Sequence, residues 1–125
     1  MTATAAAAIA SRPGGQGDEI LGMRPAAVFA PESAGEAAAV LERSDRDGLR
    51  LVFAGGRTMM SVGAPPRALD AVVETRALSR IVEHAPSDQI AVVEAGVTLA
   101  ALQDALAKAG QRLAADPPEP ERATI

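Results

Sequence analysis

The sequence contains no cysteine, tryptophan or tyrosine, and its two phenylalanines are Phe29 and Phe53. The absence of cysteine excludes disulfides, thiolate metal sites and cysteine nucleophiles from these residues. Because aromatic side chains are so few, the core has to be built from Ala, Val, Leu and Ile, which bury less apolar area per residue. We therefore expect a thin core.

Basic residues are fewer than acidic residues, since the sequence has 12 Lys and Arg against 16 Asp and Glu and a net charge of −4. A nucleic-acid groove needs a basic surface with aromatic side chains, so we expect no nucleic-acid partner. The opening Met1–Ile9 is rich in alanine, but it carries no basic residue and is too short to cross a bilayer. We expect a cytoplasmic protein without a membrane span.

The sequence does contain an alternation of strand and helix signals after a loose start. Pro and Gly at residues 12–17 interrupt regular structure, so we expect residues 1–22 to be a flexible tail and residues 23–125 to belong to one α/β domain. The predicted order is strand, helix, strand, loop, three strands, helix, and the last two strands form a hairpin. These elements are expected at about residues 26–31, 34–47, 49–53, 71–74, 80–84, 89–95 and 98–109.

The ends of both helices carry local signals. Ser33 stands three residues before Glu36, which is the spacing of a capping box, and Gly48 is placed to end the first helix. Thr98 can cap the second helix, and Gly110 can end it. The sequence therefore predicts both helices from their termini as well as from their apolar faces.

The strongest chemical signal follows the second predicted strand, in the loop Ala54-Gly55-Gly56-Arg57-Thr58. Glycine permits positive φ and the close approach of a ligand, so several backbone N–H groups can converge on one anion, usually a phosphate. Thr58 adds a hydroxyl donor at the rim, as does Ser61, and Arg57 can add charge. On spacing alone, an ordinary tight turn is the simpler interpretation.

Two common phosphate-binding motifs are absent from this segment. The P-loop is excluded because it needs a lysine after its glycines, and the only lysine is Lys108. The dinucleotide fingerprint G-x-G-x-x-G does not follow Phe53, and Gly63 is followed by Ala-Pro-Pro rather than by a helix. Nicotinamide dinucleotide binding therefore has little support.

No residue is assigned a catalytic or metal-binding role. His84 is the only histidine, and without a neighbouring carboxylate or hydroxyl it is best interpreted as part of an exposed strand. Glu74, Glu83 and Glu94 lie on separate predicted strands, where alternation places them on a solvated face. We expect neither an acid/base pair nor a metal site from them.

Six segments in a fixed order resemble the FAD-binding domain of the p-cresol methylhydroxylase type, also called the vanillyl-alcohol oxidase family. The resemblance covers about residues 24–125 and is greatest to the FAD-binding subunit of glycolate oxidases. Its specificity comes from the order of the segments rather than from the glycine pair alone. The segments are VFAPES with Glu36, FAGGRT, VVETRAL, VVEAGVTL, GQRLAADPP and the ATI at residues 123–125.

The resemblance implies a fold of two small α/β pieces with FAD between them, of which this chain is the N-terminal subdomain, a small mixed sheet with flanking helices. The family loop commonly has a third glycine where Arg57 stands. Members with covalent flavin often carry a histidine where Thr58 stands, so non-covalent FAD is implied here. The implied cofactor-binding residues are Ala54, Gly55, Gly56, Arg57, Thr58, Asp116, Pro117 and Thr124.

The resemblance also implies a flavin-dependent oxidoreductase acting on a small 2-hydroxy acid such as glycolate, with other oxidase subunits as partners. We expect the sequence to stop before the domain is complete, so that this piece alone is inactive and binds FAD weakly. Two alternatives remain open at this point. One is the flavin subunit of a molybdenum hydroxylase, and the other is a non-enzymatic α/β interaction module in which the glycine loop is only a turn.

Overall fold

A computed structural model describes residues 9–125, which separate into two compact units. Unit 1 runs to Phe53 and also contains Gly63–Glu74. Unit 2 contains Ala54–Val62 and Thr75–Ile125. The glycine loop therefore belongs to unit 2, although the strand that leads into it lies mostly in unit 1.

Unit 1 is built on a four-stranded sheet in the order β1-β2-β4-β3. Strand β1 pairs antiparallel with β2, and β2 pairs parallel with β4, so the sheet is mixed, which confirms the predicted fold class. The strands are β1 (Ser11–Pro13), β2 (Ala27–Phe29), β3 (Leu51–Ala54) and β4 (Ala71–Glu74).

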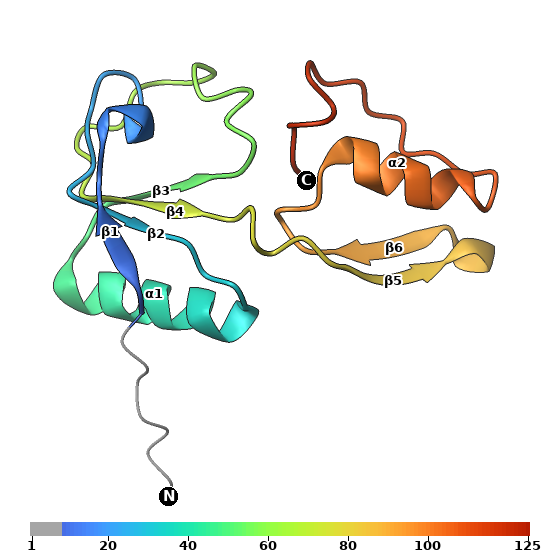
Figure 1. The fold of residues 1–125 in the computed structure, drawn as a ribbon, viewed down its shortest axis with the longest axis horizontal. Helices are drawn as coiled ribbons and strands as arrows, with labels where there is room; N and C mark the ends of the chain where they lie inside the picture. The colour runs from blue at the N-terminus through green and yellow to red at the C-terminus, as the bar shows by residue number, and fades with distance from the viewer. Residues whose placement is uncertain (1–8) are drawn as a thin grey trace, which may run out of the picture. The chain divides into compact units, whose positions relative to one another are not determined.

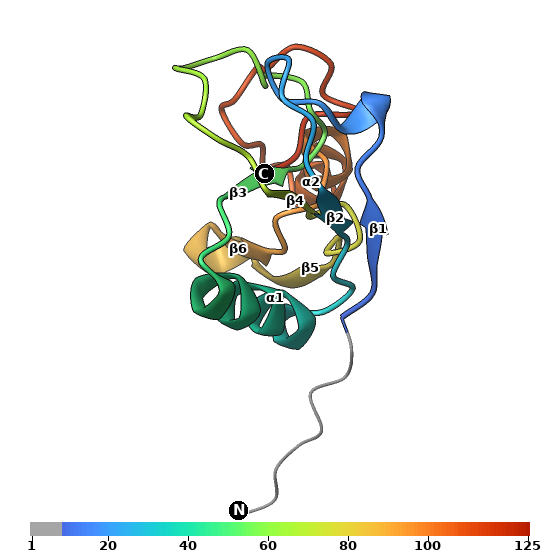
Figure 2. The same cartoon turned by 90° about the vertical axis from the view of Figure 1, so that its left-hand side faces the viewer.

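Helix α1 (Ala34–Asp47) connects β2 to β3 and lies along one side of these strands in both views (Figures 1 and 2). Its Val40 is fully buried and packs in one cluster with Phe29, Ala71 and Val73 from β2 and β4. The cluster joins the helix to the two parallel strands, so unit 1 has a closed apolar core.

The ends of α1 lie where the sequence predicts them. The Ser33 hydroxyl accepts a hydrogen bond from the Glu36 backbone N–H at 3.2 Å, and the Glu36 carboxylate accepts one from the Glu32 N–H at 2.8 Å. Gly48 ends the helix with φ 65°, a left-handed conformation that glycine adopts without strain. Side-chain and backbone signals within a few residues thus define this helix.

The start of unit 1 differs from the prediction of a loose tail. Residues 11–13 form β1, and Gln16–Asp18 form a short 3-10 helix, η1. The nearly buried Asp18 carboxylate explains this order, because it accepts two hydrogen bonds from Arg12, at 2.6 and 2.8 Å, and one from the Gly15 N–H. The part of the predicted tail at residues 1–8 lies outside the described residues.

Unit 2 contains the predicted hairpin and the second helix. Strand β5 (Ile81–Ala85) pairs antiparallel with β6 (Ile90–Val93), and the short helix η2 (Pro86–Asp88) joins them. Helix α2 (Leu99–Ala107) lies alongside this hairpin (Figure 1). The core of unit 2 is small and contains Val93, Val97, Leu102 and Leu106.

Helix α2 begins as predicted and ends slightly earlier than predicted. The Thr98 hydroxyl caps it by accepting a hydrogen bond from the Ala101 N–H at 3.2 Å. The helix stops at Ala107, and Gly110 takes the left-handed conformation at φ 67° after a short turn. The N-terminus of α2 is therefore fixed, and it lies next to the C-terminal segment described below.

Candidate functional site

The glycine loop is anchored where β3 ends. Ala54 is buried, and its carbonyl oxygen accepts a hydrogen bond from the Thr75 N–H at 3.0 Å. The Gly56 N–H donates to the Thr124 hydroxyl at 3.3 Å. The loop is thus joined to two segments of unit 2 that are far away in the sequence.

Both glycines are needed for close packing inside the protein. A Cβ added at Gly55 would overlap the Thr124 side chain, and a Cβ added at Gly56 would overlap the carbonyl group of Arg122. The sequence predicts that these glycines permit positive φ and the approach of a ligand. Their first role is instead to admit the segment 122–124, and neither has a positive φ.

The positive φ of the loop falls on Arg57, at 57°. A residue with a Cβ adopts this left-handed conformation at a cost of about 1–2 kcal/mol. The family resemblance placed a third glycine at this position, and the backbone conformation explains why glycine suits it. The loop therefore holds Arg57 in a backbone conformation that its Cβ disfavours.

Two arginines outside the loop converge on its carbonyl oxygens. The Arg76 Nε donates to the Gly55 oxygen at 3.2 Å, and its Nη2 reaches the Gly56 oxygen at 3.5 Å. The Arg122 Nη2 reaches the same Gly56 oxygen at 3.4 Å. The sequence did not predict a role for either arginine. The only signal was their position, since Arg76 lies inside the family-like segment VVETRAL and Arg122 directly precedes the segment ATI.

Each arginine is held by its own surroundings. The Arg122 Nη1 forms an ion pair with the Glu119 carboxylate at 2.6 Å. Arg76 belongs to a tight turn in which the Leu78 N–H donates to the Thr75 oxygen at 2.9 Å. This turn packs on Gly96, where an added Cβ would overlap the carbonyl oxygens of the turn.

The C-terminal segment is fixed against the start of α2. Thr98 and Thr124 form an isolated antiparallel bridge, and the Leu99 N–H donates to the Ala123 oxygen at 2.8 Å. The Ile125 N–H donates to the Val97 oxygen at 3.0 Å. The Thr124 hydroxyl therefore stands in a defined position beside Gly56.

A cavity of about 640 Å³ in unit 2 opens beside these groups. Guanidinium groups and hydroxyls predominate among its polar side chains, and one carboxylate is present. This chemistry fits an anion such as phosphate better than a cation, because arginine and hydroxyl groups donate hydrogen bonds to phosphate oxygens. The polar side chains of the lining are Arg76, Arg122, Ser79, Thr98, Thr124 and Glu121.

The structure does not bring all the predicted cofactor residues together. Asp116 is exposed and lines a separate cavity of about 430 Å³ with Gln103 and Arg112. In the part of the chain that the structure describes, no hydrogen bond joins Asp116 or Pro117 to the glycine loop. The roles of these two residues in cofactor binding stay predictions.

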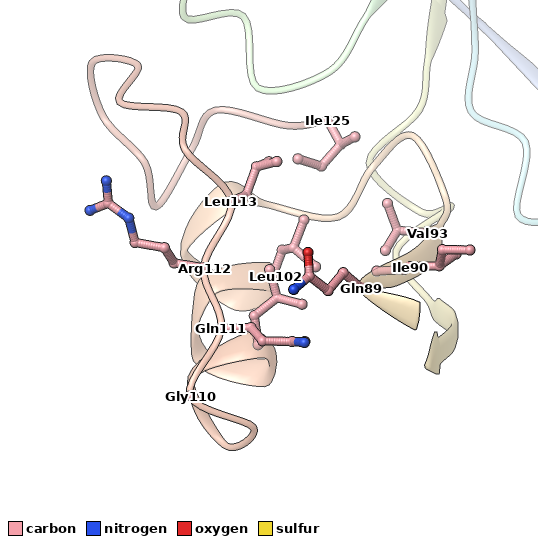
Figure 3. Close-up of a pocket in the computed structure, with 11 residues that line it drawn as sticks. Gln89, Ile90, Val93, Leu102, Gly110, Gln111, Arg112, Leu113 and Ile125 are labelled. Atoms are coloured by element: carbon pink, nitrogen blue, oxygen red, sulfur yellow. The ribbon is translucent and has the colours of Figure 1, made fainter. Parts of the chain in front are cut away.

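Another cavity, of about 570 Å³, lies between the hairpin and α2 (Figure 3). Its lining is largely apolar, with Ile90, Leu113 and Ile125 among its members, and it contains none of the predicted cofactor residues. His84 lies nearby, and its Nε2 is 2.9 Å from the Gln111 side-chain oxygen. His84 is half-buried rather than exposed as predicted. Its contact with Gln111 gives the imidazole a structural role in unit 2.

The glutamates do not form an acid/base pair. The Arg80 side chain and backbone both donate to Glu94, and these hydrogen bonds lower the pKa of the Glu94 carboxyl. The Glu94 side chain is only 13% exposed, so it is less solvated than the sequence predicted, because it is turned onto Arg80. Among residues 9–125 the structure shows no group of three metal-ligating side chains and no helix that is long and apolar enough to cross a membrane.

Comparison with known proteins gives one family and several related folds. The model of a family described as "FAD binding domain" matches residues 25–125. No curated protein sequence matches the chain. The matching solved structures include an alkyldihydroxyacetonephosphate synthase, with a TM-score of 0.69 and 20% identity over 81% of this chain and 21% of that one.

Two further structures define the type of fold. p-Cresol methylhydroxylase with substrate bound has a TM-score of 0.59 and 16% identity, over 69% of this chain and 17% of that one. The grass pollen allergen Phl p 4, with glucose dehydrogenase activity, has a TM-score of 0.60 and 18% identity, over 70% of this chain and 18% of that one. The chain spans about a fifth of the length of these structures, and at such identities the likeness shows the fold alone.

Proposed function

The chain belongs to the FAD-binding domain family, and from this membership we propose that its loop Ala54–Thr58 binds the pyrophosphate of FAD. FAD is the cofactor of this family and of the p-cresol methylhydroxylase type of fold. We include Asp116, Pro117 and Thr124 in the proposed cofactor site. Membership of this family favours FAD binding over the interaction-module alternative.

The observation that carries the proposal is the convergence of Arg76 and Arg122 on the loop that the Thr124 hydroxyl also contacts. Arg122 is ion-paired with Glu119, so Arg76 supplies most of the positive charge at the loop in a chain whose net charge is −4. The hydroxyls of Thr58 and Thr124 add donors. Together they favour a doubly charged pyrophosphate over a neutral ligand.

We further propose that the cofactor is bound without a covalent link at this loop, because Thr58 stands where covalent members of the family often have histidine. Precipitating the complete natural protein with acid should leave FAD in the supernatant. Flavin fluorescence that stays with the denatured protein band would contradict this proposal.

For the complete protein we propose a flavin-dependent oxidoreductase that acts on a small 2-hydroxy acid such as glycolate and works with other oxidase subunits. When bound, FAD accepts the hydride of such a reaction. The support is the order of the six family-like segments. Anaerobic addition of glycolate should bleach the flavin absorbance, whereas an unchanged spectrum with glycolate and other 2-hydroxy acids would reject this substrate class.

Substitutions at the loop test the pyrophosphate assignment. Gly56→Asp should abolish FAD retention by the complete protein, because it adds bulk and negative charge at the loop. Gly35→Asp is the matched control, since Gly35 lies in the first turn of α1, where an added Cβ meets only the Ser33 hydroxyl at an ordinary 3.9 Å and an acidic residue is favourable. A folded and fully yellow Gly56→Asp protein would reject the assignment.

A second pair separates charge from folding. Thr58→Asp and Thr58→Asn differ mainly in charge, and Thr58 is only half-buried. If the loop faces a pyrophosphate, the Asp variant should bind FAD at least about tenfold more weakly than the Asn variant, a difference of about 1.4 kcal/mol. Equal affinities of the two variants would place the phosphates elsewhere.

A further inference from the structure

Arg76 lies in the turn that follows β4, and its side chain returns to the glycine loop. Its Nε donates to the Gly55 oxygen at 3.2 Å and its Nη2 reaches the Gly56 oxygen at 3.5 Å. The first hydrogen bond is the shorter and therefore the stronger of the two. In the described part of the chain, the hydrogen-bond partners of this guanidinium are backbone oxygens and not carboxylates.

These contacts fix the direction in which the loop presents its N–H groups. The described peptide bonds are all trans, so the C=O and the following N–H of each peptide point in opposite directions. A guanidinium that holds the Gly55 and Gly56 oxygens on one side turns the Gly56 and Arg57 N–H groups to the other side. The Gly56 N–H accordingly donates a hydrogen bond to the Thr124 hydroxyl.

The backbone strain at Arg57 explains why the loop carbonyls need these hydrogen bonds. Arg57 has φ 57°, and a rotation of the Gly56–Arg57 peptide would return that φ to the ordinary negative range. The same rotation would turn the Gly56 oxygen away from Arg76 and Arg122. The two guanidinium groups therefore oppose the relaxation that the Arg57 backbone favours.

Backbone hydrogen bonds fix the position of the turn that contains Arg76. The Thr75 N–H donates to the Ala54 oxygen at 3.0 Å, which ties the turn directly to the start of the loop. The Gly96 N–H donates to the Leu78 oxygen at 2.7 Å and closes the turn from the other side. The distance between the Arg76 backbone and the glycine loop is thus set by main-chain hydrogen bonds.

We infer that Arg76 is a positioning residue: it holds the Gly55 and Gly56 carbonyls so that the Gly56 N–H stays on the Thr124 hydroxyl and the Arg57 N–H keeps its direction toward a phosphate. The inference rests on the proposed FAD-binding function of the loop. Pre-ordered donors bind an anion more tightly than donors that must first be ordered, so loss of Arg76 should weaken the binding of phosphate-containing ligands selectively.

The test compares FAD with riboflavin, which has no phosphate, in the apo form of the complete protein. Arg76→Lys and Arg76→Gln should each weaken FAD binding at least about tenfold and leave riboflavin binding unchanged within about twofold. Lysine keeps the charge but lacks the planar fork that can reach two consecutive oxygens. Arg46→Gln is the control, since Arg46 is an exposed arginine in the last turn of α1, in unit 1.

A second variant tests the role of backbone strain. Arg57→Gly removes the strain that favours rotation of the peptide, so the loss caused by Arg76→Gln should be smaller when residue 57 is glycine. An equal loss in both backgrounds would overturn the inference. So would an Arg76→Lys protein with wild-type FAD affinity, or equal losses of FAD and riboflavin affinity.

The same titrations separate this inference from the function on which it rests. If the wild-type protein binds FAD no better than riboflavin, the pyrophosphate site itself is wrong. If the wild-type protein prefers FAD and all Arg76 variants retain that preference, only the positioning role is wrong.

Discussion

In unit 1 the apolar side chains of β2 and β4 are closed off from solvent, whereas the hairpin of unit 2 leaves most of its apolar side chains in water. Val28, Val72 and Val73 are at most 1% exposed. In the hairpin, Val82 is 61% exposed and Ile90 is 54% exposed. Unit 1 therefore gains stability from buried side-chain area, and the hairpin gains little from it.

Unit 2 has a small apolar core around Val97 and is also held together by backbone segments that touch at glycines. Gly55 and Gly56 admit the segment 122–124, and Gly96 admits the turn at 75–78. These contacts position the very groups that we assign to the phosphate site. The candidate site therefore depends on glycines, which have no Cβ to prevent these contacts.

The largest expected effect is that of Gly96→Ala. An added methyl group would overlap the carbonyl oxygens of Thr75, Arg76 and Leu78, and backbone cannot move aside as a flexible side chain can. We expect a loss of about 3 kcal/mol in the free energy of unfolding, measured by urea denaturation. Gly35→Ala in α1 is the control, and it should stabilise by about 0.5–1 kcal/mol because its Cβ makes only an ordinary 3.9 Å contact with the Ser33 hydroxyl in a helix.

A somewhat smaller effect on stability should distinguish the buried side chains of unit 1 from the exposed side chains of the hairpin. Val72→Ala removes two methyl groups from a fully buried position of β4 and should cost about 2 kcal/mol. Val82→Ala in β5 should change stability by less than about 0.5 kcal/mol, since Val82 is largely exposed. Similar losses for both substitutions would show that the hairpin is covered in solution and that the contrast between the units is wrong.

Arg57→Gly should raise stability modestly. Glycine adopts the φ of 57° without strain, which offsets its larger loss of conformational entropy on folding. We expect a gain of up to about 1 kcal/mol in urea denaturation. Destabilisation would mean that contacts of the Arg57 side chain outweigh the strain of its backbone.

The smallest effect concerns pH. Hydrogen bonds from the Arg50 side chain and backbone lower the pKa of Asp70 from 3.8 to about 2. A carboxyl with a lowered pKa in the folded state stabilises fully above its unfolded pKa, and this contribution is lost as the pH falls from about 4 to about 2. Asp70→Asn should therefore reduce the loss of stability in that range, which urea midpoints at each pH would measure.

The Arg80–Glu94 pair of unit 2 offers the matching experiment, because hydrogen bonds from Arg80 also lower the pKa of Glu94. Glu94→Gln should reduce the acid-induced loss in the same direction as Asp70→Asn. If neither substitution changes the pH dependence, these surface ion pairs contribute nothing measurable to either unit.

Local signals made the regular elements of the fold predictable. The Ser33 cap and the Gly48 stop act within a few residues of α1, so the sequence predicts both of its ends. Strand β1 was not predictable in this way. It depends on the pairing of Ser11 with Phe29 and on the contact of Arg12 with Asp18, and the sequence around residue 11 carries neither signal.

The candidate site was predictable in its location but not in its construction. The glycine pair marks the loop, and the family-like segments extend the site to Thr124, which the structure places against Gly56. Arg76 depends on backbone oxygens 20 and 21 residues away, and Arg122 depends on one that is 66 residues away. A sequence does not mark a carbonyl oxygen as a partner, so such contacts become visible only in the folded chain.

The most direct test of the phosphate site is an amide chemical-shift titration of the isotopically labelled chain with ADP and, separately, with adenosine. We expect that ADP shifts the amide signals of residues 55–58 and of Thr124, that adenosine does not, and that the dissociation constant of ADP lies above about 1 μM. Shifts confined to the cavity between the hairpin and α2, or equal shifts with adenosine, would contradict the assignment of the loop to the pyrophosphate of FAD.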